Sequence, residues 1–404
     1  METNRSAKTM ENKLYYQDAY ITTFSAMVEK QAQDTAGNWY VVLNQTAFYP
    51  TGGGQPYDLG TIENRMVVNV EEIEGEIRHY LEEPLIDKDK EISAVIDWKR
   101  RFDHMQQHAG QHILSAAFEQ LFDYKTVSFH LGEEIVTIDL ETDALSEREV
   151  KRVEELANQM ILENRPIETK WVNEEEMSLY SLRKETKVKD NIRLVIIPDF
   201  DVNGCGGTHP KATGEVRAIK ILDWERQRKN IRVQFICGER VLTQFGQKQR
   251  VLLELTKQLN APELGMEQAV RRMIENGKTL EKELETYQDQ LLKYEARDLL
   301  DKNKNKIVSE VFQNRTIQEL QKLARTIISE EEQTLVLFVS ENENRLQLVC
   351  ARGQARSENM KTVLGSALPL INGKGGGNDS FAQGGGETLL TGRHMLEQLL
   401  HSVN

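Results

Sequence analysis

The chain has 404 residues, of which 39% are hydrophobic and 28% are charged, and its formal net charge is −13. These values predict a soluble globular protein of two or three domains, and three cysteines without a regular spacing argue against a disulfide framework. No stretch reaches the about eighteen apolar residues of a membrane-spanning helix, and residues 1–20 lack the apolar centre of a signal peptide, so we expect a cytoplasmic protein that does not contact a membrane.

The negative charge restricts how the chain can bind nucleic acid. Indiscriminate binding through phosphate contacts needs a broad surface of Lys and Arg side chains. We therefore expect any nucleic acid to be bound by local basic patches, such as Lys99-Arg100-Arg101 or residues 226–229.

Residues 1–96 alternate β-like runs with turn-rich breaks, and the runs cover residues 19–28, 39–43, 61–70 and 91–96. This pattern predicts a small β-barrel or sheet. Within the region, Gly52, Gly53 and Gly54 directly precede Gln55. Three consecutive glycines let the backbone approach a ligand or another segment closely, and the Gln amide can both donate and accept hydrogen bonds. A hairpin loop explains the same pattern equally well.

The next region, residues 97–238, begins with a predicted helix, His104–Phe118, that carries two histidines. His108 and His112 are four residues apart, so both imidazoles lie on one helix face and can reach one metal ion. Ala109 follows His108 where zinc proteases of the H-E-x-x-H type have a glutamate base, which argues against a protease.

A second pair of residues with metal-ligand spacing, Cys205 and His209, lies in a glycine-rich loop. Cys and His are the ligands that zinc prefers, and three imidazole nitrogens with one thiolate complete a tetrahedron. The two pairs together predict a zinc site. Two alternatives stay open: ordinary surface or core residues, or a purely structural zinc without an open position.

The rest of this region mixes a helix with strands. Ser146 and Glu149 form a capping-box pattern at the start of a helix that Pro166 ends. Strand-like runs follow at residues 167–171, 193–197, 216–222 and 231–237. Helices beside an antiparallel sheet predict an α+β domain.

Residues 239–303 form a predicted helical segment that is broken once, at Asn260-Ala261-Pro262. After the break, apolar side chains recur at spacings of four and three, from Met273 through Leu280, Leu284 and Leu291. This pattern is typical of a coiled coil and predicts a homodimer, although a packed helical hairpin within one chain has the same pattern.

The last region, residues 304–404, alternates strand and helix patterns and predicts an α/β domain. Strands are expected at residues 307–312, 334–339 and 346–350, and helices at 317–328 and 360–370. A glycine-rich loop follows, from Lys374 to Gly386. Its backbone N–H groups around one lysine suggest a phosphate cradle, but the glycine spacing of a Walker A motif is absent, and a flexible loop is the alternative.

Three separated motifs resemble one family. The segments 106–114, 205–209 and 48–55 are similar to the editing domain of alanyl-tRNA synthetase and to its free-standing relatives, the AlaX proteins. The loop from Lys374 to Gly386 is similar to the C-terminal domain of that synthetase, which is shared with DHH phosphoesterases. The order of the motifs and the chain length match the long-form AlaX proteins.

The resemblance implies a zinc-dependent hydrolase that removes serine or glycine from mischarged alanine tRNA. It implies that His108, His112, Cys205 and His209 bind the zinc, and that Gly52, Gly53, Gly54 and Gln55 line the amino-acid pocket. Thr46 is our candidate for contact with a serine hydroxyl, and Lys374, Gly375, Gly376 and Gly377 are candidates for tRNA contact. Nothing in the first hundred residues looks like a class II synthetase core. We therefore expect the protein to hydrolyse mischarged tRNA without ATP and not to attach amino acids to tRNA.

The division of catalytic roles stays open. With His108 and His112 as its ligands, zinc either activates water or anchors the amino group of the substrate, while a tRNA hydroxyl or Gln111 positions the water. Three alternative functions also stay open. These are a zinc-stabilised tRNA-binding module without turnover, a phosphoesterase whose nearest motif is Asp103-His104-Met105, and a deacylase for threonine-type or D-amino-acid errors.

Overall fold

The chain forms two compact units, Met1–Glu254 and Leu255–Asn404. The computed structural model describes residues 12–87, 90–184, 191–303 and 305–403. Within these ranges, no helix combines the length and the apolar character that crossing a lipid bilayer requires. Helices and strands are both abundant in each unit, so the expected α+β class is confirmed.

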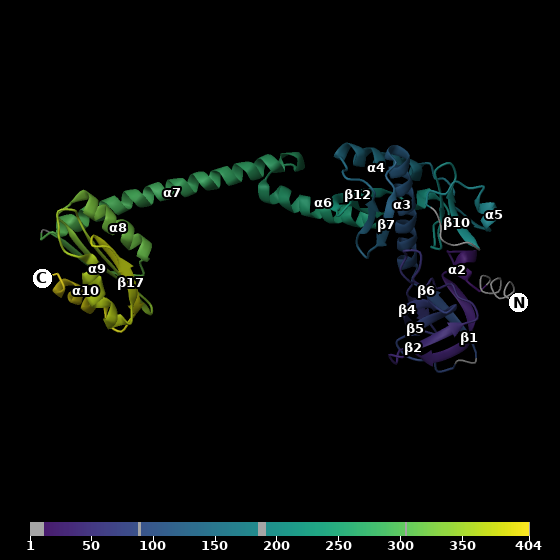
Figure 1. Ribbon diagram of the computed structural model, residues 1–404, viewed down its shortest axis with the longest axis horizontal. Helices are drawn as coiled ribbons and strands as arrows, with labels where there is room; N and C mark the ends of the chain where they lie inside the picture. Colours follow the sequence, from purple (N-terminus) through teal and green to yellow (C-terminus); the bar gives the residue numbers. More distant parts are fainter. Residues whose placement is uncertain (1–11, 88–89, 185–190, 304, 404) are drawn as a thin grey trace. The chain divides into compact units, whose positions relative to one another are not determined.

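Six strands of the first unit close into a barrel in the order β1-β2-β5-β4-β3-β6 (Figure 1). A short helix, α2 (Leu14–Gln17), precedes the barrel. The barrel interior is apolar, with Val41, Ile62 and Val67 fully buried, and the expected small barrel is confirmed. The strands are β1 (Thr23–Gln33), β2 (Trp39–Leu43), β3 (Gly60–Ile62), β4 (Arg65–Ile73), β5 (Glu76–Leu81) and β6 (Glu91–Ile96).

The barrel differs from the expected strand pattern in two places. The run 61–70 is two strands, because Glu63 and Asn64 form a turn with φ angles of 46° and 62°. Positive φ at both central residues is the geometry of a tight hairpin turn. Strand β5 was not expected, because Arg78 and His79 interrupt its apolar pattern, although His79 is buried.

The basic run Lys99-Arg100-Arg101 is not the exposed patch that we expected. Arg101 is fully buried, and its Nε donates a hydrogen bond to Asp58 Oδ1 at 2.8 Å. A buried arginine needs such a carboxylate partner because an unpaired buried charge is costly. Arg101 therefore joins α3 to the barrel and is not available to nucleic acid.

Helix α3 (Trp98–Phe122) follows the barrel and is the central helix of the first unit. Asp97 caps its first turn by accepting a hydrogen bond from Arg100 N, and Asp123 ends it in the left-handed conformation. The predicted segment His104–Phe118 is its buried middle. Helix α4 (Glu147–Leu162) packs beside it and has the predicted capping box of Ser146 and Glu149.

Two sheets complete the first unit. One has the order β12-β13-β8-β7 and shares its apolar core with α3 and α4, and the other has the order β11-β10-β9. Strands β7, β8 and β11 were not expected, because they are short and mix polar with apolar residues. The elements are β7 (Thr126–Leu131), β8 (Val136–Leu140), β9 (Glu168–Val172), α5 (Glu174–Met177), β10 (Ile192–Ile197), β11 (Asp201–Gly204), η1 (Thr213–Val216), β12 (Ile219–Gln227) and β13 (Asn230–Cys237).

The helical region is interrupted where the sequence predicts it. Helix α6 (Glu239–Leu259) ends before Asn260, η2 (Glu263–Gly265) follows, and α7 (Met266–Lys302) continues. Within the described part of α7 only Met266, Ala296 and Leu299 are buried. The side chains of the predicted a/d pattern, including Met273, Leu284 and Leu291, are exposed.

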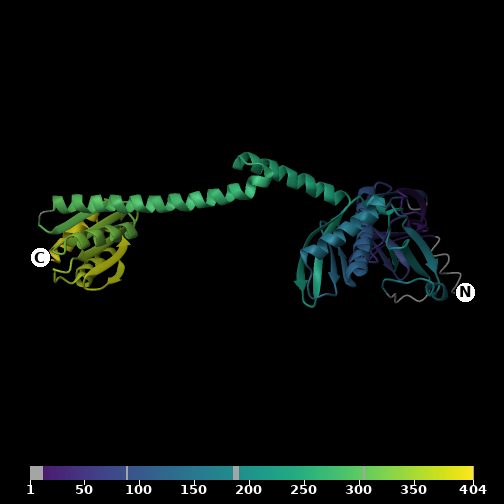
Figure 2. The ribbon, with the colours of Figure 1, turned by 90° about the horizontal axis from the view of Figure 1, so that it is seen from above.

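The sheet of the second unit has the order β14-β15-β16-β18-β17. Figure 2 shows the strands and helices of this unit in green and yellow. Apolar side chains of β15 alternate between two cores, since Val336 and Phe338 pack with α8, whereas Leu337 and Val339 pack with α9 and α10. Helix α10 was not expected. The elements are β14 (Ile307–Gln313), α8 (Ile317–Glu330), β15 (Leu335–Asn342), β16 (Arg345–Arg352), α9 (Met360–Ala367), η3 (Leu368–Ile371), β17 (Lys374–Gly377), β18 (Phe381–Glu387) and α10 (Gly392–His401).

The glycine-rich segment from Lys374 to Gly386 is not a loop. It forms the antiparallel strands β17 and β18 at the edge of the sheet. A Cβ atom added at Gly384 would lie 2.8 Å from Leu368 Cδ2, so glycine allows the strand to pass close beneath this side chain. Backbone pairing and close packing therefore outweigh the low strand propensity of glycine.

Candidate metal centre and its cavity

Four side chains with metal-binding atoms meet in the first unit. His108 and His112 extend from α3, and Cys205 and His209 come from the loop after β11. Their ligand atoms all lie within 4.8 Å of one another. Cys205 Sγ is 3.4 Å from Nε2 of His108 and 3.4 Å from Nε2 of His209. The two pairs that the sequence singles out thus form one cluster that can hold a metal ion.

Hydrogen bonds orient two of the imidazoles toward the cluster. Nδ1 of His108 is 3.2 Å from Gln55 Oε1, and Nδ1 of His112 donates to Asp201 Oδ2 at 2.8 Å. Each bond leaves Nε2 free to face the other donors, as in protein metal sites where a second residue fixes the ring. Among the described residues, Nδ1 of His209 is buried without a hydrogen-bond partner.

The electrostatics of the cluster favour a thiolate. Burial raises the pKa of Cys205, but the imidazoles of His108 and His209 outweigh it and hold the pKa well below its usual range. Burial also lowers the pKa of His112, yet the hydrogen bonds with Asp201 and Cys205 raise it to about 9. Burial lowers the pKa of His209 to about 3, so its ring is neutral. One thiolate and three imidazole nitrogens are a donor set that suits zinc.

The glycine motif lies directly against this cluster. Gly52 and Gln55 close a tight turn, since Gly52 N donates to Gln55 O at 3.1 Å and Gln55 N donates to Gly52 O at 2.9 Å. The buried Gln55 amide donates to Thr208 Oγ1 at 2.8 Å and accepts from Thr208 N at 3.0 Å. Gln55 therefore connects the barrel to the Cys205–His209 loop.

Two glycines allow this contact. Gly54 has a φ of +81°, and a Cβ atom there would lie 2.8 Å from the ring of Phe129. A Cβ atom at Gly207 would lie 2.3 Å from His108 Cε1, which is closer than unbonded atoms approach. Any larger residue at Gly207 would push the His108 ring or the loop itself.

A cavity of about 350 Å³ opens at the cluster. Phe129 stacks on His108 in its wall, with ring centroids 5.4 Å apart and planes inclined by 25°. Gln111 also lines the cavity, and its Nε2 donates to Ser115 Oγ at 2.9 Å. The lining residues are Gly53, His108, Gln111, His112, Thr126, Ser128, Phe129, Arg183, Lys184, Asn203, Gly204 and Cys205.

Of the residues expected to contact substrate or tRNA, only Gly53 lines this cavity. The others, which are Gly52, Gly54, Gln55, Thr46 and Lys374–Gly377, do not. The buried Thr46 hydroxyl is 2.8 Å from His79 Nε2 and accepts a hydrogen bond from Phe48 N at 3.0 Å, inside the barrel. Lys374–Gly377 is strand β17 of the second unit, where all four residues are exposed. A role in substrate binding for Thr46, and in tRNA binding for Lys374–Gly377, stays a prediction.

Sequence reasoning missed three residues of the site. Asp201 holds His112, Thr208 binds Gln55, and Arg183 donates from Nε to Asp201 Oδ1 at 2.7 Å. Thr208 lies between Cys205 and His209 in the sequence, so its place in the site could have been predicted. Asp201 and Arg183 carry no spacing signal, because the fold alone brings their strand and loop to α3.

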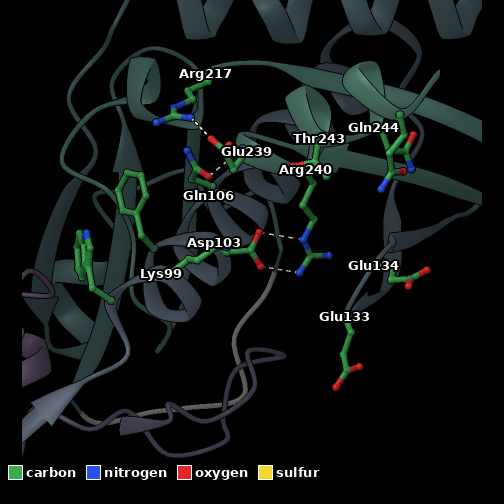
Figure 3. A pocket seen from close by; sticks show the side chains of 13 residues that line it. Lys99, Asp103, Gln106, Glu133, Glu134, Arg217, Glu239, Arg240, Thr243 and Gln244 are labelled. Atoms are coloured by element: carbon green, nitrogen blue, oxygen red, sulfur yellow. Dashed lines mark hydrogen bonds and ion pairs between the residues drawn. The ribbon is translucent and has the colours of Figure 1, made fainter. Parts of the chain in front are cut away.

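A larger cavity, of about 670 Å³, lies at the start of α3 and is separate from the metal cluster. Figure 3 shows Asp103 and Arg240 pointing toward one another there, and Arg240 Nη2 donates to Asp103 Oδ2 at 2.6 Å. His104 is buried. Asp103-His104-Met105 is therefore occupied by internal contacts and does not form a metal-binding motif of phosphoesterase type.

Three family models match the chain. Residues 192–236 match the threonyl and alanyl tRNA synthetase second additional domain, residues 1–100 match the class II (A) tRNA synthetases, and residues 303–404 match the DHHA1 domain. The match of residues 1–100 to a class II synthetase model was not expected; the described part of this segment forms the β-barrel and the start of α3. The fold and these matches place the chain in a class of proteins. Its members contain the second additional domain of the threonyl and alanyl tRNA synthetases.

The relatives narrow this class to one family. The chain is 30% identical to the alanyl-tRNA editing protein AlaX-L of Pyrococcus horikoshii, over 93% of this chain and 94% of that protein. It is 34% identical to the alanyl-tRNA editing protein Aarsd1-B of Xenopus laevis, over 62% of this chain and 61% of that protein. The chain belongs to the family of alanyl-tRNA editing proteins, as its motifs predict.

A synthetase also matches, but over a smaller share of its own length. The alanine–tRNA ligase of Pyrococcus furiosus is 34% identical over 72% of this chain, which corresponds to 33% of the ligase. The chain thus spans about a third of the ligase that it matches.

Proposed function

We propose that the protein hydrolyses the ester bond of alanine tRNA that carries serine or glycine, and does so without ATP. The observation that carries this proposal is that one cavity is lined by His108, His112 and Cys205 of the cluster and by Gly53 of the Gly52–Gln55 turn. Membership of the alanyl-tRNA editing family supports the choice of substrate. We expect the protein in the cytoplasm, where translation uses this substrate.

We propose zinc as the metal, bound by His108, His112, Cys205 and His209. A zinc ion with such ligands acts as a Lewis acid that polarises a carbonyl oxygen and activates water. Gln55 and Asp201 hold the rings of His108 and His112, so the donor atoms are in place before metal or substrate arrives.

The other cavity side chains would bind and orient the aminoacyl ester. An ester is already an activated bond, so orientation of ester and water supplies much of the required acceleration. Gln111 lines the cavity beside His112 and can orient a water molecule through its amide, because Ser115 occupies only one of its hydrogen-bonding positions. Phe129 closes the wall next to His108 and limits the entry of bulk water.

Selectivity against alanine needs a polar group where the serine hydroxyl falls. Such a group is left unpaired by alanine, which costs about 1–3 kcal/mol, or about ten- to hundredfold in rate. We keep Thr46 as the proposed partner, with the consequence that its hydroxyl must exchange its contact with His79 or Phe48 for one with the substrate.

Replacement of Thr46 tests this assignment. Thr46→Val should lower seryl-tRNA hydrolysis by about ten- to hundredfold and glycyl-tRNA hydrolysis less, with unchanged zinc content. Thr126→Val is the comparison, because Thr126 lines the cavity itself and its hydroxyl donates to Ser115 Oγ at 2.8 Å. Equal losses on both substrates for Thr46→Val, together with a serine-selective loss for Thr126→Val, would move the role to Thr126.

We further propose that the protein is a homodimer joined through α7 and that Lys374–Gly377 contacts tRNA. The exposed apolar row that includes Met273, Leu280, Leu284 and Leu291 supports the first proposal, since a second copy would bury it. An exposed lysine beside glycine backbone supports the second, since both offer donors to phosphate.

A panel of charged alanine tRNAs tests the function as a whole. The purified protein should release serine or glycine and spare alanine. Release of threonine or a D-amino acid instead would indicate a different deacylase. Binding of every tRNA in the panel without any release would indicate a binding module.

A further inference from the structure

Arg183 has unused hydrogen-bond donors at the metal-site cavity. Its side chain is 8% exposed, lines the cavity with His112 and Asn203, and donates from Nε to Asp201 Oδ1 at 2.7 Å. Among the residues that the structure describes, Nη2 of Arg183 is buried without a hydrogen-bond partner. A guanidinium has five N–H donors, and donors that are buried without a partner are costly.

The surroundings of Arg183 suit an anion. Lys184 lines the same cavity and is exposed, and the hydroxyls of Thr126 and Ser128 are in its wall. Arginine binds phosphate with two parallel hydrogen bonds, and the unpartnered Nη2 of Arg183 can donate to such an anion. In a chain with a net charge of −13, attraction of a tRNA phosphate depends on such local basic groups.

The position of Arg183 also limits which anion it can bind. Asp201 stands between the guanidinium and His112, because Oδ1 accepts from Arg183 and Oδ2 accepts from His112. The Asp201 carboxylate and the His112 imidazole therefore separate Arg183 from the atoms that would bind the metal and the ester. The nearest anion of an aminoacyl-tRNA is the 5′ phosphate of the nucleotide that carries the amino acid.

We propose that Arg183 binds this 5′ phosphate of the esterified terminal nucleotide, with Lys184 beside it. The inference rests on the proposed function, because it concerns the same cavity and the same substrate. Arg183 would then have two roles. Its Nε–H orients Asp201, which orients His112, and its other N–H groups bind the phosphate of the substrate. The chemical class that the site recognises is a nucleoside monophosphate that carries an aminoacyl ester.

Two small substrates that differ only in the phosphate test the proposal. One is the 3′-seryl ester of adenosine 5′-monophosphate, and the other is the 3′-seryl ester of adenosine. The intact wild-type protein should prefer the phosphorylated ester by about ten- to hundredfold in kcat/KM, mainly through KM, as expected for a charge-assisted hydrogen bond. Arg183→Gln should lose the preference, so that it hydrolyses the two esters with about the same kcat/KM.

Two further variants separate substrate binding from support of the metal site. Arg183→Lys keeps the charge and should keep part of the preference. Arg232→Gln is the matched control, because Arg232 pairs with Asp139 on strands that do not line the cavity, and it should keep the full preference. Zinc content is measured for every variant and should be unchanged in Arg183→Lys.

The outcomes distinguish this inference from the proposed function. A wild type that hydrolyses seryl-tRNA but shows no preference for the phosphorylated ester overturns the inference alone. So does an Arg183→Gln variant that loses zinc and slows equally on both esters, since Arg183 would then act only through Asp201. A zinc-loaded wild type that hydrolyses neither the esters nor seryl-tRNA overturns the proposed function itself.

Discussion

At the metal centre, Asp201 determines which nitrogen of His112 faces the other donors. Its carboxylate accepts from His112 Nδ1 and also binds Arg183, so it is itself held in place. The four residues of the cluster were predictable, because Cys and His at short spacings are rare in this chain. Asp201 was not, because an aspartate in a strand becomes a partner of His112 only when the chain folds back onto α3.

Replacement of Asp201 tests this support. Asp201→Asn keeps a side-chain oxygen but removes the charge, and we expect zinc affinity to fall by about 10- to 100-fold. Asp139→Asn is the matched control, because Asp139 also pairs with an arginine but lies away from the cluster. Competition with a chelator measures both affinities. Equal affinities for Asp201→Asn and the wild type would show that His112 needs no such support.

At the scale of elements, helices were easier to predict than strands. The helix at Ser146 has both a capping box and an apolar face, which are local signals. Strands β7 and β8 carry little local signal and form because they pair with β13 and cover α3. Strands β17 and β18 even contradict their glycine composition, because Leu368 packs closely over Gly384. Contacts between segments that are distant in the sequence thus determine these strands, and local composition does not predict them.

The close approach of the Cys205–His209 loop to α3 depends on Gly207. Gly207→Ala places a methyl group where His108 lies, so we expect the variant to lose most of its zinc. Gly246→Ala is the control, because a Cβ atom at Gly246 meets nothing within 4 Å and alanine favours the helix. Metal analysis of both proteins decides the matter. A full zinc content in Gly207→Ala would mean that the loop can shift to accept the methyl group without loss of zinc affinity.

For the whole molecule, the boundary between the two units falls within α6 and suggests a cut that keeps the first unit. A chain that ends at residue 254 keeps the barrel, the cluster and the cavity. We expect it to be a monomer that retains zinc and hydrolyses seryl-tRNA, with tRNA affinity below that of the full chain. Light scattering and tRNA titration measure these properties.

A single substitution separates dimer contact from deletion effects. Leu284→Glu places a charge in the exposed apolar row of α7, so the full-length variant should also be a monomer. A wild type that is already monomeric would contradict the dimer, and unchanged tRNA affinity of the shortened chain would remove the second unit from tRNA recognition.

The central claim is that the His108, His112, Cys205 and His209 cluster supports hydrolysis of mischarged alanine tRNA through a bound metal. The most direct measurement is the rate of serine release from seryl-tRNA for alanine by the full-length protein, before metal removal, after it, and after addition of zinc. We predict that release stops on metal removal, returns with zinc, and never extends to alanyl-tRNA. Serine release that continues unchanged in the metal-free protein, or no release by the zinc-loaded protein, would contradict the claim.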